Sequence, residues 1–379
     1  MQSTESSTRQ LISATLARLE EYYVAPGQTW TIDLVIRNLE APRWRFKMGP
    51  AVEVIAPHEC AASPSPDSTL SMSSAMLVEI LRNPTGFDPR NAKSLALGGL
   101  LIDGANRPAA YWLQLLKRPG AAQRASFVRA RANAPTSLQE IPHVVAPEKS
   151  ARELRELVVN ALEHSTPLHL RNLLEWPEIR WTLDDWCKRE GATLLPLQSV
   201  PGRYLSVAEF IGTLTRKLAI GGTDSASGYT AGCLLPPEWD ARFQLPQLPA
   251  DAFSPGQLWF GRQCTHSPVT ALHCDLDHSF LAQILGRKRV RLYSPSLEQE
   301  LYAFDTFNSF RPCRVDVGAP DLNRHPRFAD ARGVEVVLAP GDLLIIPTGW
   351  FHAVWALDHV LSISRILGND KLMRLREHG

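Results

Sequence analysis

Two short stretches of the sequence carry side chains that could bind a metal ion. His273 and Asp275 are separated by a single residue, and His352 follows a Pro-Thr-Gly-Trp-Phe turn further along the chain. Residues two apart on a β-strand point to the same face, so His273 and Asp275 can converge on one point. Two histidines and one carboxylate on one side of a divalent metal leave the opposite positions open for substrate and oxygen. Each motif alone is weak evidence for a metal site. His273 and Asp275 could be an ordinary surface or core pair, and His352 could be a buried, hydrogen-bonded histidine.

A lysine in the segment Gly-Arg-Lys-Arg-Val-Arg-Leu-Tyr could bind the anionic end of a cosubstrate. The alternation of this segment places Lys288 with Val290 and Leu292 on an inward face, and the intervening arginines in water. Burying an ammonium group is unfavourable unless an anion meets it. The distal carboxylate of a dicarboxylic acid would meet this need; the alternative is that the lysine extends to the surface.

These residues lie in a part of the chain where strand patterns dominate. Gly and Pro separate short apolar runs, which favours an antiparallel sandwich or barrel. The predicted strands cover residues 256–261, 279–285, 287–293, 334–338, 343–346 and 352–357. A helix is predicted upstream, over residues 153–163.

The first part of the chain has a different, α+β pattern. Apolar residues from Leu11 to Tyr23 recur at helical spacing. Strands are predicted over residues 29–38, 52–55, 68–73 and 100–104, and helices over 73–82 and 107–116. Residues 117–131 then carry five basic side chains and no acid. We interpret residues 119–149 as a solvated linker, with a contact to an acidic partner as the alternative.

Composition limits the class of protein. The 379 residues predict two or three domains, and 44% hydrophobic with 21% charged residues is typical of a globular protein. A net charge of +1 makes nucleic-acid binding an unfavoured interpretation. The six cysteines are scattered without a CxxC pair, which favours a reducing compartment. With no apolar run long enough for a membrane span and a polar start, we expect a cytoplasmic protein.

Taken together, the motifs from about residue 256 to 366 resemble the JmjC-type, cupin-fold family of Fe(II)- and 2-oxoglutarate-dependent oxygenases, in its hydroxylase branch. The resemblance is carried by Thr-Ala-Leu-His-Cys-Asp at 270–275, Phe-Leu-Ala-Gln-Ile-Leu-Gly-Arg-Lys-Arg-Val-Arg-Leu-Tyr-Ser-Pro at 280–295, Pro-Arg-Phe at 326–328 and Pro-Gly-Asp-Leu-Leu-Ile-Ile-Pro-Thr-Gly-Trp-Phe-His at 340–352. It implies an all-β-rich double-stranded β-helix (cupin or jelly roll) with flanking helices.

The resemblance also implies roles for particular residues. His273, Asp275 and His352 correspond to the iron ligands. Lys288 corresponds to the anchor for the distal carboxylate of 2-oxoglutarate, and Thr270 to a hydroxyl that assists it.

Two further positions match the family less closely. The resemblance aligns Tyr229 with an upstream tyrosine of the family that contacts the cosubstrate. Ser279 stands where members of this branch often have Asn, which implies an altered cosubstrate geometry. Cys274, between two of the implied ligands, should point away from the metal by strand alternation.

The N-terminal part is similar to the sterol-carrier-protein fold, in which a five-stranded sheet and helices surround an apolar tunnel. The similarity rests on Asp-Ser-Thr-Leu-Ser-Met-Ser at 67–73, Asp-Pro-Arg-Asn-Ala at 88–92 and Gly-Gly-Leu-Leu-Ile-Asp-Gly at 98–104. An accessory role in dimerisation or substrate docking is favoured over lipid carriage. The predicted domains are a sterol-carrier-like domain (1–118), the linker (119–149) and the oxygenase domain (150–379).

The predicted activity is hydroxylation of a C–H bond in a protein, peptide or small molecule, with release of succinate and CO2. Demethylation is less favoured, because no histone-reader module or zinc-cluster spacing accompanies the domain. The alternatives are a cupin enzyme that uses another metal and a non-catalytic cupin and sterol-carrier-like protein that binds a small ligand or partner. A homodimer is left open. Candidate substrate contacts are Asp305, Asn308, Arg311 and Arg314.

Overall fold

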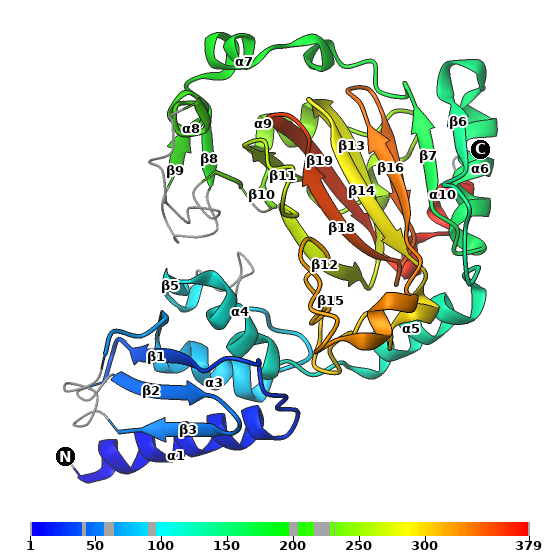
Figure 1. The fold of residues 1–379 in the computed structure, drawn as a ribbon. Coiled ribbons are helices and arrows are strands. Elements are labelled where there is room, and N and C mark those ends of the chain that lie inside the picture. Colours follow the sequence, from blue (N-terminus) through cyan, green and yellow to red (C-terminus); the bar gives the residue numbers. More distant parts are fainter. Residues whose placement is uncertain are drawn as a thin grey trace. The chain divides into compact units, whose positions relative to one another are not determined.

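A computed structural model describes residues 2–39, 43–56, 64–89, 96–196, 204–215, 228–230 and 232–377. The chain divides into two compact units (Figure 1). The first is built mainly from residues 1–121 and includes residues 305–309, and the second is built mainly from residues 122–304 and 310–379. Part of the N-terminal motif at 88–92 lies outside the described residues.

The N-terminal unit is a five-stranded sheet with helices; its α+β class was predicted, whereas β2 was not among the four predicted strands. The strand order is β3-β2-β1-β4-β5, with β1 and β4 parallel and the other neighbours antiparallel. The strands are β1 (Trp30–Ile36), β2 (Arg43–Met48), β3 (Val52–Ile55), β4 (Ser68–Met72) and β5 (Leu101–Gly104). The helices are α1 (Gln2–Glu20), α3 (Ser74–Arg82) and α4 (Asn106–Leu115).

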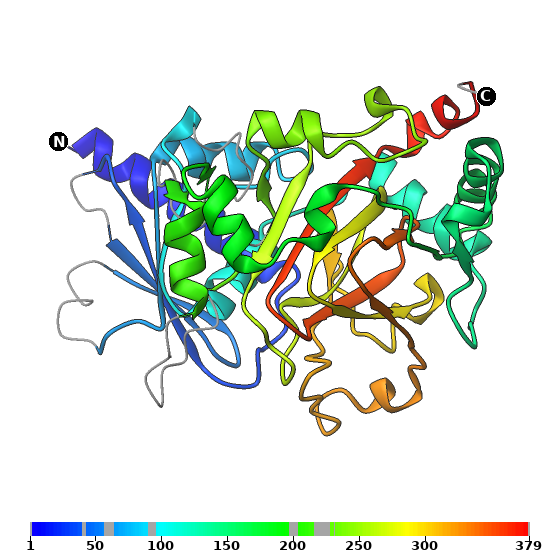
Figure 2. The same cartoon turned by 90° about the horizontal axis from the view of Figure 1, so that it is seen from above.

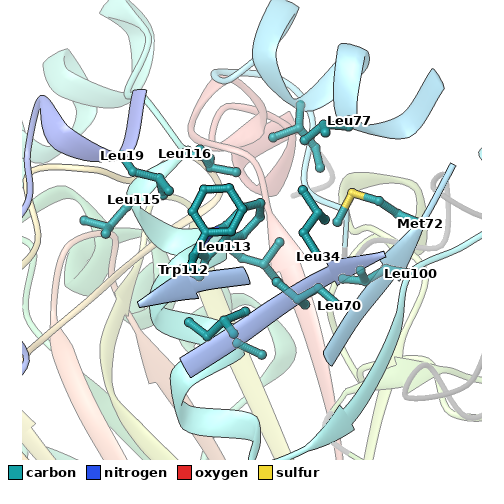
Figure 3. Packing of buried hydrophobic residues seen from close by; sticks show 14 of the residues in the cluster. Leu19, Leu34, Leu70, Met72, Leu77, Leu100, Trp112, Leu113, Leu115 and Leu116 are labelled. Carbon is teal, nitrogen blue, oxygen red and sulfur yellow. The ribbon is translucent and has the colours of Figure 1, made fainter. Parts of the chain in front are cut away.

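One face of this sheet and the helices share an apolar core (Figure 3). Alternation along β1 directs Ile32 and Leu34 into it, where Trp112 of α4 is also fully buried. The other set of β1 positions holds Asp33, which is buried and paired with Arg45 at 2.6 Å. The sheet therefore has an apolar face toward the helices and a buried ion pair on its opposite side.

The second unit contains two sheets that pack together through their inner faces (Figure 1). The seven-stranded sheet has the order β10-β11-β19-β13-β17-β7-β6, and the five-stranded sheet has the order β15-β12-β18-β14-β16. Leu281 and Ile346 of the first share a core with Val290 and Val354 of the second. This arrangement is consistent with the predicted jelly roll.

Six of these strands (β11, β13, β14, β16, β17 and β18) lie within about one residue of predicted strands, whereas β6, β7, β10, β15 and β19 were not predicted. The seven-stranded sheet contains β6 (His143–Val145), β7 (Leu168–Arg171), β10 (Cys233–Leu234), β11 (Gln257–Gly261), β13 (His278–Leu285), β17 (Leu343–Ile346) and β19 (Val360–Leu367). The five-stranded sheet contains β12 (Thr270–Asp275), β14 (Lys288–Tyr293), β15 (Phe310–Pro312), β16 (Val334–Leu338) and β18 (Phe351–Ala356). A separate two-stranded sheet pairs β8 (Leu194–Pro196) with β9 (Tyr204–Ser206).

Helices cover the outer faces of the second unit. The predicted helix α6 (Ala151–Glu163) begins with a capping box between Ser150 and Glu153 and packs on the outer side of β13 and β17. The other helices described here are α7 (Leu183–Glu190), α8 (Val207–Thr215), α9 (Pro237–Arg242) and α10 (Arg374–Glu377). The orange segment between β14 and β16 is a long excursion that contains β15 (Figure 2).

The stretch interpreted as a linker holds regular structure instead. Residues 119–149 contain α5 (Ala121–Asn133) and β6, which pairs in parallel with β7. Only Phe127 and Ala130 of α5 are buried, and the helix is otherwise made of alanine, polar and basic residues apart from one valine. The amphipathic signal is therefore too weak to be recognised, and tertiary packing of two side chains specifies the helix.

Among the described residues, no helix combines the length and apolar character that crossing a lipid bilayer requires.

We expect Trp112→Ala to destabilise the N-terminal unit by roughly 3–5 kcal/mol, because the buried indole packs edge-on against Phe46 and its loss leaves a cavity. Denaturant unfolding monitored by far-UV circular dichroism measures the change. Val24→Ala, at a position 48% exposed, is the control and should change stability by less than about 0.5 kcal/mol. Equal effects of the two substitutions would contradict this account of the core.

Candidate metal centre

The pairing of β12 with β18 brings the three candidate ligands together. The two strands are antiparallel, and His273 lies directly opposite His352. Asp275, two residues beyond His273, projects to the same face. One ligand atom from each of the three residues lies within 4.8 Å of the other two. Among the described residues, this is the one cluster of three or more His, Cys, Asp or Glu side chains with such spacing.

Backbone carbonyls fix the orientation of both imidazoles. His273 Nδ1 lies 2.8 Å from the carbonyl oxygen of Ala271, and His352 Nδ1 lies 3.1 Å from that of Trp350. Because a carbonyl can only accept, Nδ1 carries the proton in each ring and Nε2 keeps its lone pair. Burial, followed by the neighbouring His273, lowers the pKa of His352 to about 4. His352 is therefore a neutral imidazole near pH 7, which is the form that binds metal.

The donor set fits a divalent transition metal. Two imidazole nitrogens and a carboxylate oxygen form the facial arrangement that such ions accept while keeping other positions free. The three side chains are not equally covered: His352 is buried, whereas His273 and Asp275 are 15% and 24% exposed. The centre is thus closed on the β18 side and open on the β12 side.

Lys288 lies on the same inner face, farther along β14. It is 1% exposed, and its Nζ donates to Tyr229 Oη at 3.0 Å. The Tyr229 hydroxyl is also hydrogen-bonded to the side chain of Thr270. No carboxylate of the described residues forms an ion pair with Lys288, and burial lowers its pKa to about 7. Three of the four predicted cosubstrate-binding residues are therefore linked by hydrogen bonds through the Tyr229 hydroxyl.

Strand register gives the spacing between this anion site and the candidate ligands. Leu292 of β14 is the partner of His352, and Lys288 is four residues away along the same strand. Four residues correspond to roughly 13 Å of strand. The lysine side chain and a five-carbon dicarboxylate can bridge this distance together.

The remaining predicted positions lie elsewhere. Ser279 is on β13 in the facing sheet and is buried, and its proposed contact with a cosubstrate stays a prediction. Cys274 is fully buried and lies opposite Phe351, on the other side of the sheet from the ligands.

Two of the four candidate substrate contacts have structural roles. Asn308 is buried and donates to the carbonyl oxygen of Phe87 within the first unit. Arg311 is buried and paired with Glu298 at 2.5 Å. Arg314 is stacked over the ring of Phe304, and Asp305 is exposed.

The sequence analysis missed the strand that borders the open side of the centre. In β15, Phe310 lies opposite Asp275 and Pro312 lies opposite His273, so both share the inner face with the candidate ligands. The ring of Phe310 meets the imidazole of His273 edge to face, with centroids 5.7 Å apart. The Phe-Arg-Pro sequence of β15 does alternate apolar and charged residues. Three residues are nevertheless too few for this alternation to be recognised as a strand.

Residues 235–365 match the family of cupin-like domains. The chain is also similar in sequence to proteins named as lysine-specific demethylases and as tRNA wybutosine-synthesizing proteins.

Individual relatives match over limited lengths. The lysine-specific demethylase 8 of Xenopus tropicalis is 45% identical over 106 residues, which are 28% of this chain and 23% of the relative. The protein of the same name from Danio rerio is 28% identical over 253 residues, or 60% and 58% of the two chains. The tRNA wybutosine-synthesizing protein 5 of Danio rerio is 38% identical over 132 residues, which are 33% of this chain and 39% of the relative. The matches therefore span from about a quarter to less than two thirds of these relatives.

We expect the purified protein to bind one Co(II), used as a spectroscopic probe, and Asp275→Ala to weaken this binding by more than about 100-fold. Loss of an outer-shell partner already costs roughly 10- to 100-fold in metal affinity, and a direct ligand should cost more. Titration of the visible Co(II) absorption measures the dissociation constant. Asp184→Ala, at an exposed position on α7, should leave it unchanged. Unaltered binding by the Asp275 variant would exclude this carboxylate as a ligand.

Proposed function

We propose that this protein is an Fe(II)- and 2-oxoglutarate-dependent oxygenase that hydroxylates a C–H bond of a protein, peptide or small-molecule substrate. The observation that carries the proposal is a buried lysine without an acidic partner among the described residues, on the same face as a His-Asp-His cluster. Cupin-like domains that only present a metal have no need of a buried cation at this position. The cupin-like match supports the same class.

The three ligand candidates and the anion site have separate tasks in this proposal. His273, Asp275 and His352 would hold the iron. When bound, iron with 2-oxoglutarate and oxygen supplies oxidation that yields succinate and CO2 and adds one oxygen atom to the substrate. The hydrogen-bonded Nδ1 atoms of the histidines keep Nε2 directed at one point, so the chain presents its ligands already oriented.

Lys288 would hold the far carboxylate of 2-oxoglutarate. In a buried site an ammonium–carboxylate pair is strong because water does not screen it. The hydroxyls of Tyr229 and Thr270 can donate to the same carboxylate, and burial raises the pKa of Tyr229, so its proton is retained. These groups orient the cosubstrate so that its keto acid end faces the metal ligands.

The order of the strands indicates the side from which substrate approaches. In the sequence β15-β12-β18-β14, the anion site lies on the β14 side of the ligands and β15 lies on the other. The exposed fractions of His273 and Asp275 point to the β15 side as the open one. Phe310 and Pro312 would then form an apolar wall beside the reacting carbon of the substrate.

Hydroxylation and N-demethylation differ only in the carbon attacked, because an N-hydroxymethyl product loses formaldehyde. The relatives are named for a lysine demethylase and for tRNA wybutosine synthesis, so their names point to different substrates. We propose hydroxylation, and an N-methyl substrate is the alternative that product analysis distinguishes.

The N-terminal unit is proposed as an accessory domain that docks substrate or a second subunit. Its five-stranded sheet with helices is compatible with the sterol-carrier resemblance. Its described core is filled by side chains such as Trp112 and Leu34 (Figure 3), which favours docking over carriage of a lipid.

The activity is tested by incubating the protein with Fe(II), ascorbate and 2-oxoglutarate, with cell extract depleted of small molecules or with peptide pools. We expect iron-dependent succinate formation and products 16 Da heavier, both abolished in Asp275→Ala. Release of formaldehyde with loss of 14 Da would indicate demethylation instead. Absence of succinate from protein that binds metal and 2-oxoglutarate would favour a binding protein over an enzyme.

Lys288 gives the 2-oxoglutarate site a specific pH dependence. Burial lowers its pKa to about 7 in the free protein, and a bound carboxylate would raise that pKa, so binding above pH 7 takes up a proton. We expect the dissociation constant of 2-oxoglutarate, measured by calorimetry on Mn(II)-loaded protein, to rise by up to about tenfold per pH unit above 7.

Lys288→Met separates this role from a structural one. The variant should bind 2-oxoglutarate at least about 30-fold more weakly, because a buried charge partner is lost. Without ligand it should unfold at a higher denaturant concentration than wild type, since no buried cation has to be desolvated. A variant that is less stable and still binds 2-oxoglutarate would show that Lys288 supports the fold only.

A further inference from the structure

Helix α5 packs against the outer face of the sheet that carries the candidate ligands. Its Phe127 is buried, and the ring lies edge to face against Phe351, with centroids 6.0 Å apart. The guanidinium of Arg311 lies over the Phe127 ring, 4.7 Å from its centroid. Phe351 and Arg311 are the partners of Cys274 on its two sides, so one side chain of α5 contacts both strands that flank β12.

The same helix backs the turn that precedes His352. Gly349 has a positive φ of 81°, and a Cβ placed on it would lie 2.9 Å from Cβ of Ala130. Its backbone N–H donates to the carbonyl oxygen of Asp275 at 2.9 Å. The turn is therefore held between α5 on one side and the backbone of a candidate ligand on the other.

A shared carboxylate connects α5 to β15. Glu298 accepts from Arg311 at 2.5 Å and also pairs with Arg131 of α5. The Glu298 side chain is 16% exposed, so this pairing is only partly screened by water.

We propose that α5 is the positioning element of the metal centre, and that Phe127 is its main positioning residue. The inference rests on the metal centre proposed above. Each of the three candidate ligands has a neighbour that contacts this helix. Phe351 lies beside His352, and the turn at Gly349 is hydrogen-bonded to Asp275. Arg311 lies across from the residue between His273 and Asp275. Dense packing against α5 restricts the side-chain and backbone shifts that would move the ligands apart. Removing this packing therefore weakens metal affinity more than an equally destabilising substitution elsewhere.

The chain offers a matched control in the other sheet. Phe253 is buried and packs edge to face against Phe280 of β13, with centroids 4.9 Å apart. Phe280 belongs to the core beneath α6, on the outer face of the seven-stranded sheet. Phe253→Ala thus removes the same side chain from the same kind of contact, away from the ligand-bearing strands.

The test compares Co(II) affinity and unfolding free energy in the full chain. We expect Phe127→Ala to raise the Co(II) dissociation constant about tenfold or more and to change the visible absorption of the bound ion. Phe253→Ala should lower stability similarly while changing the dissociation constant less than about twofold. Equal changes in metal affinity for the two variants, or none for Phe127→Ala, would overturn the inference. Failure of wild type to bind Co(II) would overturn the proposed centre itself.

Two milder variants keep the test decisive if Phe127→Ala does not fold. Phe127→Leu retains most of the buried volume and should give an intermediate loss of Co(II) affinity. Glu298→Gln keeps the shape of the side chain, removes the charge shared by Arg131 and Arg311, and should weaken Co(II) binding by a few-fold. If both variants bind Co(II) as wild type does, α5 has no positioning role.

Discussion

The antiparallel pairing of β12 with β18 places His273 opposite His352, and the geometry of the site depends on this register. A shift of this pairing by one residue would put His273 and His352 on opposite faces of the sheet, because side chains alternate between the faces of a strand. The register also directs Thr270 and Lys288 to the same inner face as the candidate ligands. The register of β12, β18 and β14 therefore determines the positions of the candidate ligands and of Lys288 together.

The buried ionisable side chains of the candidate site lower the stability of the folded chain. Burial lowers the pKa values of both His352 and Lys288, which means that their charged forms are destabilised inside the protein. The inner faces of the two sheets, with residues such as Val290 and Leu281, supply apolar contacts around them. Binding of the proposed metal and anion would offset the cost of the buried polar groups, so these ligands should stabilise this unit.

Much of the architecture could be predicted from local patterns. Strands such as β14 and β17 show regular alternation or a short apolar run, and α6 begins at a capping box, so their positions were predicted within a few residues. β19 is buried on both faces and so lacks the alternation of a half-buried strand, whereas β2 does alternate basic and apolar residues and was still not predicted. In α5 only two side chains are buried, which is why a basic segment was interpreted as a linker.

By itself, the sequence determined which side chains are available and which of them share a face: the one-residue separation of His273 and Asp275 and the inward phase of Lys288 are local properties of strands. Only the tertiary structure decided that His352, more than seventy residues from His273, lies opposite it, and that Tyr229 meets Lys288. It also decided that β15 borders the open side and that α5 backs the ligands. Contacts between distant segments depend on strand order and packing, which no local pattern encodes.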